Sequence, residues 1–337
     1  MSRIRNAILD FIPASLRNGL RLAKEYHRLW RLLPFQEAFP IVFNRFCYGW
    51  VSSPKKREIL NDRKHSMMEE ALLRHAFSGF SFETEAVHPL GDTDPGSLPI
   101  WVCWLQGEDA LPELNRVCVK SIRKYAGSHP VHFLTDESIP SWIDIPESIL
   151  ASYRSGRIRP VFFSDYVRCA FLARYGGVWL DSTILQTDAL CPAWFTAPWM
   201  SVKIHPADNE SVSRYRWTGF AIGGMPGSPF FKKICEMFER YFKHFDTNLD
   251  YLLIDYFFDL LANQDKKSAE WVAAVPVSHP DIHTLRSLMN EPFDSGQYHR
   301  MLAGTSLYKL TYKTTLLPLV AGDVTYWGYL LDQSRND

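Results

Sequence analysis

The sequence predicts an α/β protein, in which a parallel sheet follows a helical N-terminal extension. Residues 100–135 pass from an apolar strand pattern to a helix and back to a strand. Residues 160–184 then pass from an apolar helix through two glycines to a short apolar strand. The first 80 residues carry helical rather than strand patterns. Strands that alternate with helices in this way are typical of parallel sheets.

Composition and charge narrow the function classes. The chain has 337 residues, 46% of them hydrophobic, so it can bury about three-quarters of its unfolded surface. The 37 basic and 37 acidic residues balance, which removes the positive field typical of nucleic-acid binders. The six cysteines are too widely spaced for a zinc ribbon and too few for a disulfide scaffold. With no pattern of a signal peptide or membrane span, we expect a cytoplasmic protein, at most peripheral to the inner membrane face.

The extension begins with a basic segment. Residues 1–33 hold seven basic and two acidic residues, and their apolar positions predict two short amphipathic helices broken near Pro13. A basic amphipathic helix that ends near Trp30 could lie on an anionic membrane. The alternative is a helix packed on the main domain with its arginines in solvent.

The remaining elements follow in chain order. Residues 58–77 have a helical pattern, and residues 88–99 are rich in Pro, Gly and Asp, which indicates a loop. The next expected elements are a strand over residues 100–105, a helix over 112–125 and a strand over 131–135. We therefore expect a helical extension over residues 1–90, a catalytic domain over 98–320 and a C-terminal tail over 321–337.

The most informative stretch is residues 160–184. Ser164 is expected to cap an apolar helix or to lie in its first turn, and Gly176 and Gly177 end that helix. A short strand follows, and Asp181 stands at its carboxyl end. Because ligands of open α/β sheets bind at the carboxyl ends of strands, Asp181 marks the expected site.

Two further charged residues are expected near Asp181. Asp165 and Arg168 are three apart on the helix, hence about 5–6 Å between Cβ atoms. Two carboxylates and a guanidinium around one point suit a polyhydroxyl ligand, since carboxylates accept from hydroxyls and arginine donates in a fixed fork. The alternative is an ordinary surface ion pair, worth a few tenths of a kcal/mol.

The string SDYVRCAFLARYGGVWLDST resembles the signature of the bacterial capsular polysaccharide synthesis proteins, which are related to glycosyltransferase family 32 and distantly to the glucosylating clostridial toxins. Three more blocks resemble the family in the same order: residues 99–112, residues 217–262 and YKLTYK at residues 308–313. Together the four blocks cover about two-thirds of the chain, a strong match for a single sequence.

The resemblance implies a GT-A fold, that is, a Rossmann-type sandwich that binds a nucleotide sugar. It also implies a hexosyltransferase-like glycosyltransferase that moves a sugar from a nucleotide-diphosphate donor to a hydroxyl of a glycan or lipid-linked saccharide, with retention, in capsule or surface polysaccharide synthesis. One alternative is a non-catalytic glycan or nucleotide-sugar binder on the same fold. Another is a sugar-phosphate or nucleotidyl transferase that uses the same sheet edge.

The resemblance also assigns site residues. It places Trp104 near the nucleotide base, Asp165 and Arg168 at the donor sugar, and Asp181 as the first acid of a DXD-like motif. Lys309 and Lys313 of the closing block are expected to reach the diphosphate.

The motif departs from the family at its second acid, where this chain has Thr183. Mg or Mn would bridge the diphosphate in such a motif, but a hydroxyl brings no charge to a divalent ion. The metal would then rely on Asp181 and a later residue such as Asp281 or His283, or cationic side chains would replace it. Arg154, Arg157 and Arg159, just before the helix, could meet phosphate or simply lie in solvent.

Overall fold

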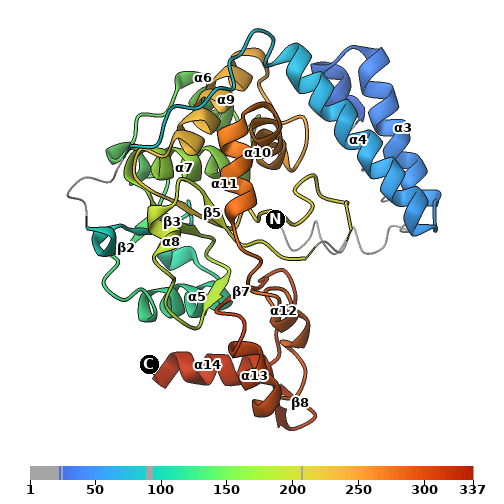
Figure 1. Ribbon diagram of the computed structural model, residues 1–337. Helices are drawn as coiled ribbons and strands as arrows, with labels where there is room; N and C mark the ends of the chain where they lie inside the picture. Colours follow the sequence, from blue (N-terminus) through green and yellow to red (C-terminus); the bar gives the residue numbers. More distant parts are fainter. Residues whose placement is uncertain (1–22, 24–25, 89–93, 206–207, 337) are drawn as a thin grey trace.

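The computed structural model describes residues 23, 26–88, 94–205 and 208–336 of the chain. A helical pair forms one margin of the molecule, an α/β body lies beside it, and a smaller group of helices and strand pairs lies below the body (Figure 1). The elements of the body place the candidate site at one edge of its sheet.

The central sheet has five strands in the order β2-β1-β3-β6-β5. Its strands are β1 (Ile100–Cys103), β2 (Val131–Leu134), β3 (Gly177–Leu180), β5 (Met200–Ser201) and β6 (Ala221–Gly224). Strand β1 is parallel to both β2 and β3, whereas β6 is antiparallel to β3 and to β5. The predicted α/β class is confirmed, but the sheet is mixed rather than wholly parallel, because β6 enters from the opposite side.

The helices are α3 (Phe35–Trp50), α4 (Pro54–His75), α5 (Glu113–Lys124), α6 (Glu147–Arg154), α7 (Pro160–Tyr175), α8 (Ala193–Thr196), α9 (Pro229–His244), α10 (Leu253–Gln264), α11 (Lys266–Ala274), α12 (Thr284–Leu288), α13 (Ser295–Leu302) and α14 (Tyr326–Asn336). Two small strand pairs complete the fold: β4 (Ile184–Gln186) with β7 (Leu307–Lys309), and β8 (Leu319–Val320) with β9 (Asp323–Val324).

Helix α7 is almost wholly buried against α9 and the sheet. Proline occupies the first position of the helix, where its fixed φ suits a helix start. Proline has no backbone N–H, but an N–H at this position would have no acceptor within the helix. The helix thus begins at Pro160, so Ser164 lies beyond the first turn and is not its cap, contrary to expectation. Burial of α7 on both sides explains why its sequence is apolar around most of its circumference.

Gly176 and Gly177 allow three chain segments to meet. Both have positive φ, 65° and 90°, which glycine adopts at little cost. A Cβ on Gly176 would lie 2.3 Å from the nitrogen of Pro226, and one on Gly177 would lie 2.0 Å from the carbonyl oxygen of Pro99. That same carbonyl accepts a 2.9 Å hydrogen bond from the N–H of Val178. The two glycines therefore fix the position of β3, and with it Asp181.

The other expected elements agree closely with the structure. The strands expected over 100–105 and 131–135 and the helix expected over 112–125 correspond to β1, β2 and α5. Of the two helices expected over residues 1–33, the structure describes a helix over residues 26–32. The expected break near Pro13 lies outside the described residues. The expected C-terminal tail contains α14, which packs on α5.

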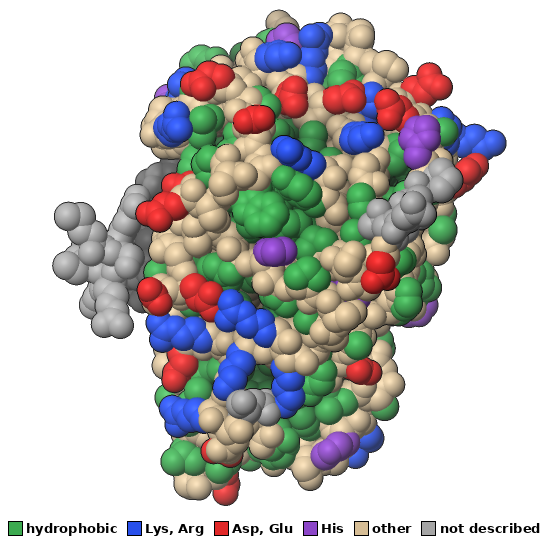
Figure 2. All heavy atoms as spheres, turned by 90° about the vertical axis from the view of Figure 1, so that its left-hand side faces the viewer, with side chains coloured by type: hydrophobic (Ala, Val, Ile, Leu, Met, Phe, Trp, Pro, Cys, Tyr) green, Lys and Arg blue, Asp and Glu red, His purple; other side chains and the backbone are tan. Residues whose placement is uncertain are grey.

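The face of the molecule drawn in Figure 2 shows no large field of one charge. Acidic and basic side chains are interspersed over the face drawn in Figure 2, in keeping with the balanced composition. Among the described residues, no helix combines the length and the apolar character needed to cross a bilayer.

We predict that Gly177→Ala lowers the free energy of unfolding by on the order of 3 kcal/mol or more, because the new Cβ meets the Pro99 carbonyl in addition to adopting a positive φ. Gly127→Ala is the matched control, since Gly127 has a φ of 63° but open space around it. Urea unfolding of the two variants separates the effect of the steric clash, which only Gly177→Ala has, from the effect of a positive φ, which both variants have. Equal losses would show that β3 does not depend on this close approach.

Candidate active site

A cavity of about 610 Å³ opens at the carboxyl ends of β1 and β3, beside the first turns of α7. Because β1 and β3 are parallel, both strands end at this edge of the sheet. The described residues that line it are Cys103, Trp104, Leu105, Gln106, Arg159, Pro160, Val161, Ser164, Arg168, Trp179, Asp181, Ser182, Thr183, Tyr251, Arg286, Lys309, Leu310, Thr311, Tyr312 and Lys313. Side chains that lie far apart in the sequence, from Cys103 to Lys313, thus share one cavity.

The pairing of β4 with β7 brings Lys309 to Asp181. Lys309 lies opposite Ile184 in this antiparallel pair, and the N–H of Leu310 donates to the Thr183 carbonyl over 3.0 Å. The N–H of Lys309 donates to the Ile282 carbonyl over 2.7 Å, which fixes β7 from its other side. The register leaves the Lys309 side chain directed at the end of β3.

Asp181 is held by two cations and one indole. Its Oδ2 lies 2.7 Å from Lys309 Nζ, and its Oδ1 accepts from Trp179 Nε1 over 3.2 Å and lies 3.8 Å from Arg168 Nη2. Burial alone would raise the pKa of this carboxyl, but Lys309 and Arg168 outweigh it and hold the pKa below its ordinary value. Asp181 is therefore a stable anion and a weak base.

Arg168 is buried, and its fork is fixed on several sides. Its Nη2 lies 3.0 Å from Asp165 Oδ1, its Nη1 donates to the Gly219 carbonyl, and its Nε donates to the Ser164 carbonyl over 3.3 Å. The guanidinium also lies 5.3 Å from the centre of the Trp179 ring. A guanidinium bound in this way presents one fixed edge to the cavity.

Asp165 stands behind Arg168 and does not line the cavity. The expected meeting of three charged groups is therefore partly realised: Arg168 lies between two carboxylates, but only Asp181 shares the cavity with it. Burial raises the pKa of Asp165 to about 7, although Arg168 opposes the shift, and Asp255 and Asp181 add to it. Asp165 orients the arginine from the protein side rather than facing a ligand.

An aromatic pair forms another wall of the cavity. Trp104 and Tyr312 meet edge to face with ring centres 5.6 Å apart. The indole N–H of Trp104 is buried and has no hydrogen-bond partner among the described residues. A buried donor without a partner is costly, so a ligand that accepts from it would gain affinity. Lys313 also lines the cavity.

The residues at the DXD-like motif do not fit a divalent metal. Lys309 Nζ donates to Thr183 Oγ1 over 2.7 Å while it also binds Asp181, so one ammonium occupies both oxygens that the motif would offer. His283 lies outside the cavity lining and packs against Phe220 with ring centres 5.8 Å apart, and burial lowers its pKa. Asp281 accepts from Thr284 Oγ1 over 3.0 Å.

Within the described residues, no group of three or more His, Cys, Asp or Glu side chains is placed to hold a metal ion. Of the two expected metal ligands, Asp181 lines the cavity and His283 does not.

Cations dominate the cavity of a protein that is neutral overall. Its described lining contains Arg159, Arg168, Arg286, Lys309 and Lys313, with Asp181 as the only carboxylate. Arg286 was not expected from the sequence, because α12 carries no pattern that links it to the sheet edge. Tyr312 was also missed, although it belongs to the YKLTYK block.

Comparisons with known proteins agree with the sequence resemblance. Residues 52–326 match the family model described as "Capsular polysaccharide synthesis protein". The chain belongs to this family. No curated protein matches the chain. Among solved structures, a chain titled "PaToxG Glycosyltransferase" is similar at 12% identity and a TM-score of 0.36, over 73% of this chain and 93% of that one.

We predict that Asp165→Asn changes how stability depends on pH. A carboxyl whose pKa rises from 3.8 to about 7 on folding stabilises the native state most at low pH, and this contribution is lost as pH rises through 7. The free energy of unfolding of the native chain should therefore fall relative to that of Asp165→Asn by about 2 kcal/mol between pH 5 and 7. Urea titrations at both pH values measure it, and a constant difference would contradict the buried, protonated Asp165.

Proposed function

We propose that this member of the capsular polysaccharide synthesis family is a glycosyltransferase with a GT-A-like fold. It would transfer a sugar from a nucleotide-diphosphate donor to a hydroxyl of a glycan or lipid-linked saccharide during capsule or surface polysaccharide synthesis. The observation that carries the proposal is the cavity itself: five cationic side chains and one carboxylate beside an aromatic wall, at the carboxyl edge of the sheet. That combination suits a ligand with an aromatic base, a diphosphate and a hydroxylated ring.

The cavity suggests how such a donor would lie. The base would stack at Trp104 and Tyr312, where the free indole N–H can donate to it. The diphosphate would lie among Arg286, Lys309 and Lys313, whose charges offset its own. The sugar would then reach Asp181, which accepts from ring hydroxyls, beside the fixed edge of Arg168.

We propose that the Lys309 ammonium supplies the positive charge that Mg or Mn supplies at an acidic motif. It is bound to both Asp181 and Thr183, and it stands where the diphosphate becomes more negative as the nucleotide leaves. Arg168 shares the same carboxylate. The chemistry of these side chains therefore favours departure of the nucleotide through protein cations.

The lining also favours transfer with retention. Inversion needs a base to deprotonate the acceptor, and the only carboxylate in the described lining is Asp181, whose pKa is lowered by its two cations. In the retaining step, the bond from the anomeric carbon to the diphosphate oxygen breaks and its electron pair stays on that oxygen. The acceptor oxygen bonds to the anomeric carbon on the same face, and its proton passes to the departing phosphate.

We predict that Lys309→Met lowers the rate of nucleotide release from the correct donor by about 100-fold or more, because it removes charge stabilisation that grows in the transition state. Incubation with a panel of uridine, guanosine and cytidine diphosphate sugars identifies the donor and measures the rate. Lys232→Met is the control, since Lys232 is exposed and does not line the cavity.

The same experiment distinguishes an enzyme from a binder. If the nucleoside diphosphates raise the melting temperature of the native chain but no donor releases nucleotide, with or without acceptor saccharides, the chain binds sugar nucleotides without turnover. If neither binding nor release occurs, the proposed function is wrong.

We predict that a chelator leaves most of the donor turnover intact, because Lys309 and not a metal neutralises the leaving diphosphate. Rates are compared in EDTA and in added Mn²⁺ with the same donor. Complete loss of turnover in EDTA, restored by Mn²⁺, would contradict the role given to Lys309.

A further inference from the structure

Helix α3 carries a stripe of exposed aromatic side chains along its whole length. Phe35, Phe39, Phe43, Phe46 and Trp50 recur every three or four residues, so they share one face. Trp30, just before the helix, extends the stripe. The six residues are 46–79% exposed, and we call them the aromatic face. Isolated apolar residues are common on surfaces, but a continuous aromatic stripe about 24 Å long marks an interaction site.

The rings of the aromatic face contact one another rather than the protein core. Phe39 lies between Phe35 and Phe43, with ring centres 5.5 Å and 5.8 Å away, and Phe46 lies 5.9 Å from Trp50. The opposite side of α3 buries Ala38, Ile41 and Asn44, and α4 packs against the helix. The helix therefore packs on α4 with one side, and its aromatic side is covered by none of the residues that the structure describes.

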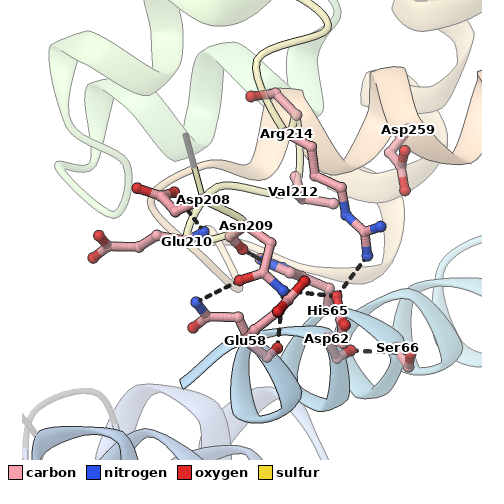
Figure 3. Close-up of polar contacts among 12 residues, drawn as sticks. Glu58, Asp62, His65, Ser66, Asp208, Asn209, Glu210, Val212, Arg214 and Asp259 are labelled. Atoms are coloured by element: carbon pink, nitrogen blue, oxygen red, sulfur yellow. Dashed lines mark hydrogen bonds and ion pairs between the residues drawn. The ribbon is translucent and has the colours of Figure 1, made fainter. Parts of the chain in front are cut away.

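Polar contacts fix helix α4 to the α/β body. Helix α3, which packs on α4, therefore cannot rotate to bury its aromatic face against the body. Figure 3 shows α4 beside the segment that holds Asn209 and Arg214. Asn209 Nδ2 donates to the Glu58 carbonyl over 2.8 Å, and Arg214 Nη2 lies 2.6 Å from Asp62 Oδ1. His65 joins the Asn209 carbonyl over 3.1 Å, and its other ring nitrogen joins the Tyr256 hydroxyl over 2.9 Å.

These contacts place α3 at the margin of the molecule, with α4 between it and the body (Figure 1).

Basic residues lie at both ends of the aromatic face. Arg31 is exposed beside Trp30, and Lys55, Lys56 and Arg57 are exposed where α4 begins, shortly after Trp50. Residues 26–57 contain six Lys and Arg but a single acid, Glu37, in a chain that is neutral overall. Glu37 is itself paired with Arg74 and His75. Aromatic rings flanked by cations complement an interface of apolar chains and anionic headgroups.

We propose that the aromatic face of α3 lies on a membrane that contains anionic lipid, with Arg31 and Lys55–Arg57 on the headgroups. A second copy of the chain is a poorer occupant, because a two-fold pairing of the stripe in either direction would bring basic ends together. The inference is independent of the proposed function, and it places the contact on residues 30–57, which overlap the basic segment 1–33 at residues 30–33.

The test is flotation of the full chain with vesicles of phosphatidylcholine, with and without phosphatidylglycerol. We expect strong binding only with the anionic lipid, and at least about a tenfold loss of binding for Phe39→Glu with Phe43→Glu. The matched control is Val277→Glu with Leu319→Glu, since these exposed apolar residues lie elsewhere on the surface. Nucleotide release from a water-soluble donor should be equal in all variants, which separates this test from that of the transferase.

A second variant tests the charges without touching the rings. Lys55→Gln, Lys56→Gln and Arg57→Gln together should weaken binding to anionic vesicles by about 100-fold and reduce its salt dependence. Equal binding by the native chain and both variants would overturn the proposal. So would absence of vesicle binding, or a dimer of the native chain that Phe39→Glu with Phe43→Glu dissociates in light scattering. Loss of the fold in that double variant would also overturn it, since the face would then be covered within the chain.

Discussion

The site depends on one ion pair, between Asp181 at the end of β3 and Lys309 at the end of β7. The two residues are 128 positions apart in the sequence, and two separate features of the fold bring them together. Gly176 and Gly177 let β3 approach Pro99 and Pro226 closely, and the pairing of β4 with β7 sets the register of Lys309. Without the ammonium, a partly buried carboxylate would face Arg168 alone, and charges removed from water without adequate partners are costly.

The same pair explains how a neutral chain can build a strongly cationic cavity. Of the five cations in the described lining, Lys309 and Arg168 share its single carboxylate, that of Asp181. Asp165 adds a carboxyl behind Arg168 whose pKa burial raises to about 7, so near neutral pH it orients the guanidinium while cancelling less of the field than an ordinary carboxylate would. The charge of the cavity is thus set by which carboxyls are exposed to it and not by the number of acids nearby.

Sequence patterns predicted the local elements well, because each rests on neighbours in the chain. The helix that ends at Gly176, the strand before Asp181 and the strand before Trp104 needed only apolar periodicity and glycine positions. Patterns could not show that Asp165 faces the protein, since a spacing of three residues places Asp165 and Arg168 together but does not say which one reaches the cavity. Arg286, Tyr312 and the partner of Thr183 depend on the register of β7 against β4, a long-range pairing that no local pattern encodes.

The pairing of β4 with β7 determines when the site forms during synthesis of the chain. Proteins are synthesised from the N-terminus, and Asp181, Arg168 and the whole central sheet emerge from the ribosome well before Lys309. A nascent chain can form the sheet and its glycine contacts, but it holds a carboxylate whose ammonium has not yet been made. Under the proposed function, competence for transfer would therefore arise only when β7 docks, and incomplete chains would not consume activated sugars.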